Sequence, residues 1–137
     1  MEKYMNIAIK LAQKAYKNGE IPVGAVIVKN GKIISKAYNK KENKKDCTKH
    51  AEILAIQKAS KKSKNWRLID CEIYITMEPC MMCAGAIEQS RISKIIYAVD
   101  NPNYGCSKLI KNVEIISGIC EENCKKMVQD FFMKKRC

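Results

Sequence analysis

The chain has 137 residues, enough for one domain with a substantial core and too few for a second catalytic domain, so we expect a single domain over residues 1–137. Its 26 Lys and Arg residues against 14 Asp and Glu residues give a formal net charge of +12, which favours a polyanionic partner such as RNA. The sequence lacks both an apolar run near the roughly 20 residues of a transmembrane helix and a signal-peptide pattern, so we expect a cytoplasmic protein without a membrane span.

The first forty residues predict a helix followed by a β-hairpin. Apolar residues at helical spacing predict a helix over residues 4–18, which an Asn-Gly pair would end. Two segments rich in Val, Ile and Ala, 22–28 and 32–38, predict neighbouring strands, because the Lys-Asn-Gly sequence at 29–31 is typical of a hairpin turn.

The rest of the chain alternates between helical and strand patterns. In chain order these are a helix at about 50–60, a polar loop at 60–65, a strand at 71–76, a helix that begins near residue 80, strands at 94–99 and 113–116, and a last helix at about 121–133. This order favours an α/β sandwich in which helices cover a sheet of about five strands.

The eight cysteines are scattered along the chain, and no secretory signal accompanies them, so we expect no disulfide framework. Cys71, Cys120 and Cys124 fall at apolar positions of the predicted elements and are expected to be reduced residues in or near the core. Cys80 and Cys83 instead form a pair with the spacing of metal ligands.

Two short strings carry the strongest chemical signal. A His-Ala-Glu string begins at residue 50, and a Pro-Cys-Met-Met-Cys string begins at residue 79. His50, Cys80 and Cys83 provide the three protein ligands of a catalytic zinc ion, whose fourth position stays open for water. Glu52 is not needed as a ligand and is free to move protons. This combination is the signature of a zinc-dependent nucleobase deaminase.

The spacing also predicts how these side chains are arranged. Cys80 and Cys83 are three residues apart at the start of a helix-favouring run, so both thiols would lie on one face of its first turn, where the helix dipole favours thiolates. His50 opens the other helical run, so two helix N-termini could converge on the metal. On an ideal helix Glu52 would point away from His50, and its catalytic role therefore requires an approach to the water from the far side.

The expected chemistry is hydrolytic deamination without an organic cofactor. Zinc lowers the pKa of a bound water from about 15.7 to about 7, which makes hydroxide available at neutral pH. We expect this hydroxide to attack C6 of adenine or C4 of cytosine. Glu52 would take the proton of the water, pass it to the adjacent ring nitrogen and help the amine leave as ammonia.

Cys47, three residues before His50, offers an alternative. With Cys47 the ligand set becomes Cys₃His, and four protein ligands would form a closed, structural zinc site in a nucleic-acid-binding protein. A structural site has no use for Glu52, and Cys47 lies in a polar segment typical of a loop. We therefore favour the open, catalytic site.

Lysine and arginine residues gather at 40–45, beside the histidine string, and at 134–136, at the end of the sequence. Each cluster is compatible with an RNA contact and also with an ordinary solvated loop or tail. The charge clusters alone do not decide between these alternatives.

Beyond the zinc ligands, the chain resembles the bacterial tRNA-specific adenosine deaminases of the cytidine deaminase superfamily. The similar segments are 21–26, 38–39, 48–52, 66–70, 76–86, 118–120 and 130–132. The zinc motif indicates the superfamily, and the flanking segments indicate the tRNA branch. The resemblance implies a three-layer α/β/α sandwich with a central mixed sheet of about five strands. It also implies deamination of the wobble adenosine of a tRNA anticodon to inosine, with release of ammonia.

The resemblance further implies one zinc ion per subunit and a homodimer whose site for the anticodon stem-loop draws on both subunits. Zinc would be held by His50, Cys80 and Cys83, and Glu52 would transfer protons. The base pocket would be lined by Asn39, Val23 and Ala51, Asp100 would contact the sugar-phosphate of the target nucleotide, and the anticodon loop would be held by Phe131, Phe132, Lys134, Lys135 and Arg136.

Several of these residues also have a purely structural alternative. Val23 and Ala51 could be ordinary packing residues, and Asn39 could cap a turn. The Phe131-Phe132 pair could anchor the last helix to the core. The functional roles of these residues follow from the resemblance alone.

Three features depart from the family pattern. Cys47 replaces the usual proline, Lys40-Lys41 replaces a basic residue followed by proline, and the segment 105–113 is shorter than the usual connection. Because that connection helps to shape the RNA-facing surface, a free nucleobase, a nucleoside or a base of single-stranded DNA is the alternative substrate.

Overall fold

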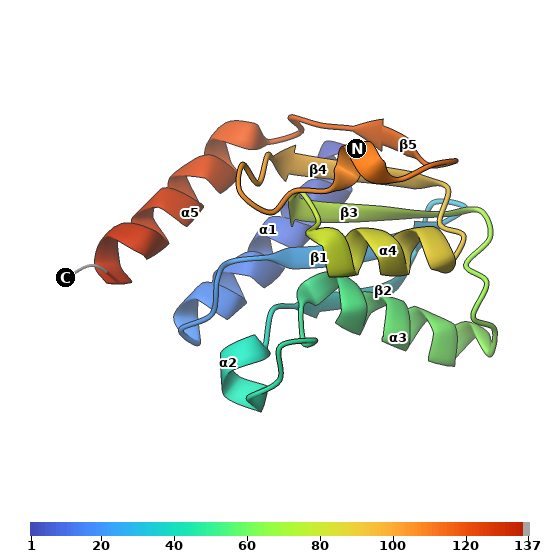
Figure 1. Cartoon of the computed structure of the whole chain (residues 1–137), viewed down its shortest axis with the longest axis horizontal. Coiled ribbons are helices and arrows are strands. Elements are labelled where there is room, and N and C mark those ends of the chain that lie inside the picture. Colours follow the sequence, from blue (N-terminus) through green and yellow to red (C-terminus); the bar gives the residue numbers. More distant parts are fainter. Residues whose placement is uncertain (136–137) are drawn as a thin grey trace.

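The computed structural model describes residues 1–135, apart from the side chain of Lys135 (Figure 1). The predicted RNA contacts of Lys135 and Arg136 therefore lie outside the described residues. Within the described part, every helix is too short or too polar to cross a bilayer.

A mixed sheet of five strands forms the centre of the fold, as predicted. The strands are β1 (Gly24–Lys29), β2 (Lys32–Tyr38), β3 (Cys71–Met77), β4 (Lys94–Val99) and β5 (Glu114–Ile116). Their order across the sheet is β2-β1-β3-β4-β5. The hairpin partners β1 and β2 are antiparallel, β1 and β3 are also antiparallel, and β3, β4 and β5 run parallel to one another.

Helices cover both faces of this sheet and complete the predicted three layers (Figure 1). The helices are α1 (Glu2–Lys17), α2 (Lys41–Lys44), α3 (Ala51–Ser63), α4 (Met81–Gln89) and α5 (Glu121–Lys135), with a 3₁₀ turn η1 (Ser107–Leu109) before β5. One buried cluster joins α3 and α4 to the sheet, and a second joins α1 and α5 to its other face.

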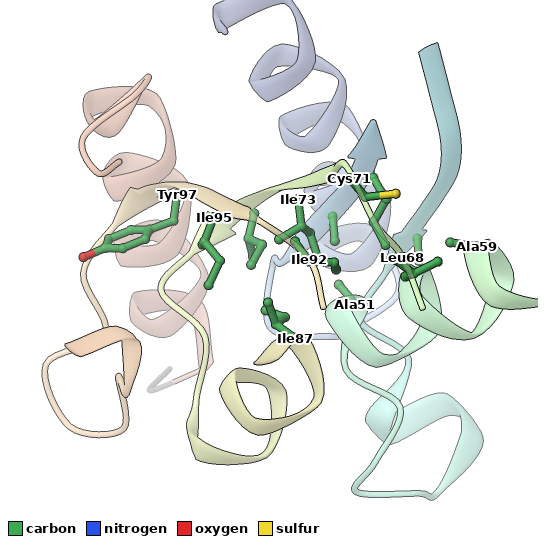
Figure 2. Close-up of a cluster of buried hydrophobic side chains, with 14 of the residues drawn as sticks. Ala51, Ala59, Leu68, Cys71, Ile73, Ile87, Ile92, Ile95 and Tyr97 are labelled. Atoms are coloured by element: carbon green, nitrogen blue, oxygen red, sulfur yellow. The ribbon is translucent and has the colours of Figure 1, made fainter. Parts of the chain in front are cut away.

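Alternation along the strands divides side chains between these two clusters. In β1, Ala25 and Ile27 face α3, whereas Val26 and Val28 face α1. Figure 2 shows the α3 and α4 side, where Ala51 and Ile87 pack beneath the strands. The inner strands β1, β3 and β4 are mostly apolar and buried, as expected of strands covered on both faces, whereas the edge strands β2 and β5 are more exposed.

Gly24 allows α1 to approach the start of β1 closely. A Cβ atom at this position would lie 2.0 Å from the carbonyl oxygen of Ala8 and 2.8 Å from the backbone nitrogen of Ala12. The Gly24 N–H donates to Thr76 Oγ1 at 3.1 Å, which ties β1 to the end of β3. Gly24 thus lets α1 pack closely against the start of β1, at the end of the sheet where the candidate site lies.

Two local differences from the sequence prediction concern the chain before β3. Helix α3 continues to Ser63, past the predicted end near residue 60, and stops at Lys64, which has a left-handed backbone (φ 55°). The short helix α2 was not predicted, because its sequence is polar and lysine-rich. It forms because the buried carboxylate of Glu20 accepts hydrogen bonds from the backbone N–H groups of Glu42 and Asn43.

Candidate active site

The three predicted zinc ligands meet where two helices begin. His50 is the N-cap residue of α3 and Cys80 is the N-cap residue of α4, both with extended backbone, and Cys83 lies in the first turn of α4. His50 Nδ1 lies 3.7 Å from the Cys80 sulfur and 3.6 Å from the Cys83 sulfur. All three potential ligand atoms lie within 4.8 Å of one another. Two helix N-termini thus converge on one point, as the spacing predicts.

These separations fit a zinc ion. Zn–S bonds of about 2.3 Å and a Zn–N bond of about 2.0–2.1 Å, at tetrahedral angles, place nitrogen and sulfur ligands about 3.6 Å apart. The two measured nitrogen-to-sulfur distances agree with this value. Three protein ligands leave the fourth position for water, which is the composition of a catalytic rather than a structural zinc site.

Protons are distributed unevenly over the ligands. Hydrogen bonding with the Cys83 thiol, and then with His50, lowers the pKa of Cys80 to about 3. The same contact with Cys80, followed by burial, raises the pKa of Cys83. The hydrogen bond with Cys80 raises the pKa of His50. The pair therefore holds one thiolate at neutral pH, and binding of a dication would release the proton of Cys83.

Glu52 reaches the same site because His50 is not helical. The backbone of His50 is extended (φ −76°, ψ 153°), so the offset expected on an ideal helix does not apply. Glu52 is 4% exposed and lines the same cavity as His50 and Cys80. Burial raises the pKa of its carboxyl group, although the backbone at the helix start and His50 act in the opposite direction. A buried carboxyl group with a raised pKa holds a proton more readily than an exposed one, which suits a group that must both accept and donate a proton.

A cavity of about 410 Å³ opens over these residues. It is lined by Ile21, Val23, Asn39, Lys41, His50, Ala51, Glu52, Met77, Glu78, Cys80, Asn101 and Tyr104. The structure thus brings all three predicted base-pocket residues, Val23, Asn39 and Ala51, beside the zinc ligands and Glu52.

Asn39 presents an unused hydrogen-bond acceptor within this cavity. Its side chain is 5% exposed, and its Nδ2 donates to the carbonyl oxygen of Ile21 at 3.3 Å. Its Oδ1 has no hydrogen-bond partner among the described residues. A buried acceptor without a donor destabilises the protein, so this atom is placed to accept a hydrogen bond from a ligand.

A second cavity of about 500 Å³ lies between the 99–104 segment and α5, next to the first. Two predicted RNA-contact residues, Asp100 and Phe132, line it. Asp100 Oδ1 accepts a hydrogen bond from the Tyr97 hydroxyl at 2.9 Å. The two cavities share Ile21, Met77, Asn101 and Tyr104 as lining residues, so they form neighbouring parts of one hollowed surface.

The other predicted contacts on α5 lie away from these cavities. Phe131 is 6% exposed and packs edge-on against Tyr16 of α1, which matches its structural alternative as an anchor of the last helix. Lys134 forms an ion pair with Asp130 at 3.6 Å, and its ammonium group lies 5.5 Å from the Tyr16 ring. Of the aromatic pair, only Phe132 faces a cavity.

Cys47 lies outside the zinc group. Its side chain is exposed, and it does not belong to the cluster of ligand atoms formed by His50, Cys80 and Cys83 in the described part of the chain. Its placement supports the open site over the closed Cys₃His alternative.

Six residues that line the catalytic cavity were not predicted as site residues, namely Ile21, Lys41, Met77, Glu78, Asn101 and Tyr104. Glu78 directly precedes the Pro-Cys string and is buried, so its position beside the motif was an available signal. Tyr104 lies in a Pro-Asn-Tyr-Gly segment typical of a turn, and no sequence pattern indicated that this turn folds over the cavity.

Comparisons with known proteins agree with this site. Residues 1–99 match the sequence model of the cytidine and deoxycytidylate deaminase zinc-binding region. The tRNA-specific adenosine deaminase of Bacillus subtilis is 42% identical over 145 aligned positions, which cover 98% of this chain and 90% of the relative. That of Haemophilus influenzae is 38% identical and covers 98% and 84% of the two chains.

A solved structure of a tRNA:A34 deaminase that edits A to I at the wobble position superimposes with a TM-score of 0.88 at 30% identity, over 93% of this chain and 99% of the other. The guanine deaminase of Bacillus subtilis is also similar, with a TM-score of 0.70 and 37% identity over 79% and 73%. The near full-length relatives and the zinc-ligand geometry agree, and this chain belongs to the tRNA-specific adenosine deaminases of the zinc-dependent cytidine and deoxycytidylate deaminase family.

Proposed function

We propose that this enzyme converts the wobble adenosine of a tRNA anticodon stem-loop to inosine, with water as co-substrate and ammonia as product. The observation that carries the proposal is the cavity in which Glu52, the zinc ligands and the unpartnered Asn39 Oδ1 meet. Its volume of about 410 Å³ lies within the range of small-molecule sites, so it can hold one extruded purine.

The positions of the side chains support a distinct role for each. His50 Nδ1 and the sulfurs of Cys80 and Cys83 would hold zinc, which supplies an activated water at neutral pH. The Glu52 carboxylate would accept a proton from that water and deliver it to N1 of the adenine, next to the carbon under attack. It would then take the remaining proton from the hydroxyl group now bonded to C6 and pass it to the amino group, which leaves as ammonia, so one carboxyl group serves as base and acid in turn.

The base would be oriented by the walls of the cavity. Val23 and Ala51 provide apolar surface against its faces, and Asn39 provides the buried acceptor. Asp100 and Phe132, which line the neighbouring cavity, would contact the rest of the nucleotide and its flanking residues. Single-stranded RNA loops are bound in this way, by splayed bases, stacking and basic surface.

Several finer properties belong to the same proposal. We infer one zinc ion per subunit, a homodimer, a single domain over residues 1–137 and a cytoplasmic location, where tRNA is found. The basis for the dimer is the family resemblance, and that for RNA binding includes the net charge of +12. Light scattering of the purified protein would test the dimer.

The substrate is tested by comparing targets. Purified enzyme would be incubated with an anticodon stem-loop bearing a wobble adenosine, with the same stem-loop bearing cytidine there, and with free adenosine and free guanine. Nucleoside mass spectrometry should detect inosine only in the first. Because guanine deaminase is also similar, xanthine formed from guanine without inosine in the stem-loop would overturn the proposal in favour of a free-base deaminase.

A further inference from the structure

Tyr104 stands between the catalytic cavity and the neighbouring one. It lines both cavities, and 72% of the residue is exposed. The second cavity is also lined by Phe132, which is 43% exposed. Large apolar side chains that are exposed together in one patch are typical of an interaction site.

The loop that carries Tyr104 is anchored at several points. Its backbone N–H donates to Asn101 Oδ1 at 3.3 Å, and the Gly105 N–H donates to the Asn101 carbonyl at 2.8 Å. On the far side of the turn, Gly105 pairs with Cys80, and the Cys106 N–H donates to the Pro79 carbonyl at 2.9 Å. The exposed ring is therefore displayed by a fixed turn next to a zinc ligand.

Glu78 is the main anchor of this turn. Its buried carboxylate accepts hydrogen bonds from the Asn101 N–H at 3.1 Å, from the Ser107 N–H at 3.3 Å and from the Ser107 hydroxyl. The turn lies so close that a Cβ at Gly105 would be 2.3 Å from Glu78 Oε1 and 2.6 Å from the Asn101 carbonyl oxygen. Only glycine allows this approach.

We propose that Tyr104 is a stacking platform for an RNA base that flanks the target nucleotide, and that Glu78 is the positioning residue that holds it there. When the target base occupies the catalytic cavity, a neighbouring base of the loop would lie in the second cavity, between Tyr104 and Phe132. This inference rests on the proposed function, because a free base or nucleoside has no flanking base.

The chemistry of this surface suits RNA. Every nucleobase has a π face, so aromatic side chains bind unpaired bases with little dependence on sequence. Lys41 lines the catalytic cavity and Lys125 lines the second, and both can meet backbone phosphates. Asp100 and Glu121 also line the second cavity, so the charge there is mixed and stacking is the main source of affinity.

The test compares Tyr104→Ala, Tyr104→Phe and Trp66→Ala in full-length zinc enzyme on the anticodon stem-loop. Loss of one stacked base should raise KM by about 5- to 150-fold in Tyr104→Ala, with a smaller change in kcat. Tyr104→Phe keeps the ring and should restore most of the lost binding. Trp66 is a matched control, since it is a similarly exposed aromatic residue (51%) that lines neither cavity.

The positioning role of Glu78 is tested through the same turn. Glu78→Gln and Ser107→Ala each weaken the hydrogen bonds between Glu78 and the turn. Zinc content would be measured for both variants. We expect each to raise KM when Tyr104 is present and to add little in the Tyr104→Ala background, because both act through that ring. Ser107→Ala keeps the inference testable if Glu78→Gln loses zinc.

An unchanged KM in Tyr104→Ala, with wild-type enzyme forming inosine, would overturn the stacking role and leave the proposed function intact. Equal effects of Ser107→Ala in both backgrounds would overturn the positioning role. Failure of the wild-type enzyme itself on the stem-loop would instead overturn the proposed function. The three results are distinguishable in one series of kinetic measurements.

Discussion

At the scale of single residues, burial of Glu52, the proposed proton carrier, has a cost in stability. Its carboxyl group is buried at the start of α3, and burial raises its pKa above the usual value of 4.5. A carboxyl group whose pKa is higher in the folded than in the unfolded state favours folding most at low pH. That contribution is lost as the pH rises through the folded-state pKa.

The upward shift of the Glu52 pKa on folding gives a prediction for Glu52→Gln. The neutral amide removes the buried charge, so zinc-free Glu52→Gln should have a higher free energy of unfolding than the zinc-free wild type at pH 7. This difference in the free energy of unfolding should shrink as the pH falls below the usual carboxyl pKa of about 4. Urea titrations at both pH values measure it, and a variant that is less stable at pH 7 would contradict the raised pKa.

Cys47 gives a second prediction at this scale. Because its thiol is exposed and lies outside the ligand cluster, Cys47→Ala should retain about one zinc ion per chain and change deamination by less than about twofold. Cys83→Ala, which removes a ligand, is the positive control and should lose most of the metal. Zinc loss in Cys47→Ala, measured by metal analysis, would support the closed site.

At the scale of the elements, the space around two glycines predicts the effect of replacing each with alanine. At Gly24 an added Cβ would meet the Ala8 carbonyl oxygen at 2.0 Å, so Gly24→Ala should lower the free energy of unfolding by about 1–3 kcal/mol or more. Gly85, in α4, has nothing within 4 Å of its added Cβ, and Gly85→Ala should raise stability by about 0.5–1 kcal/mol.

The two variants form a matched pair, since the chemical change is identical and only the surroundings differ. Denaturant titrations would measure the free energy of unfolding of each. Equal effects of Gly24→Ala and Gly85→Ala would contradict the close packing of α1 on β1.

The elements also show where sequence reasoning works and where it ends. Hydrophobic periodicity predicted all five strands and the four long helices, because each buries one face or both. It missed α2, whose first N–H groups are bound by Glu20 from a distant part of the chain. It also counted the offset of Glu52 from His50 on an ideal helix, whereas His50 is the extended residue before α3.

The same limit applies to the candidate site. The ligands and Glu52 were recognisable because their spacing is part of local motifs. The turn at Asn101 and Tyr104 was not, because its place beside the cavity depends on tertiary hydrogen bonds that Asn101 and Ser107 donate to Glu78. The adjacent Phe131 and Phe132 were treated as one unit, whereas α5 buries the first and exposes the second.

At the scale of the whole molecule, a zinc ion held by His50, Cys80 and Cys83 would join segments that are distant in the sequence. His50 comes from the start of α3, and the two cysteines come from the start of α4. A ligand that binds only the folded state stabilises it by about 4 kcal/mol when its concentration is about 1,000 times its Kd.

Removal of zinc with a chelator should therefore lower the Tm, and added zinc should restore it. Differential scanning calorimetry with and without the chelator measures the shift, with Cys83→Ala as the control that should respond little. An unchanged Tm in the wild-type protein would contradict a zinc site that links the two helices.

The most direct measurement is inosine formation in an anticodon stem-loop with a wobble adenosine, by zinc-loaded wild-type enzyme and by Glu52→Ala side by side. The wild type should form inosine, and Glu52→Ala should be slower by at least about 100-fold while it retains its zinc, because proton transfer is lost and the ligands are not. Equal rates in the two proteins, or a wild-type enzyme that holds zinc and forms no inosine, would contradict tRNA adenosine deamination at this site.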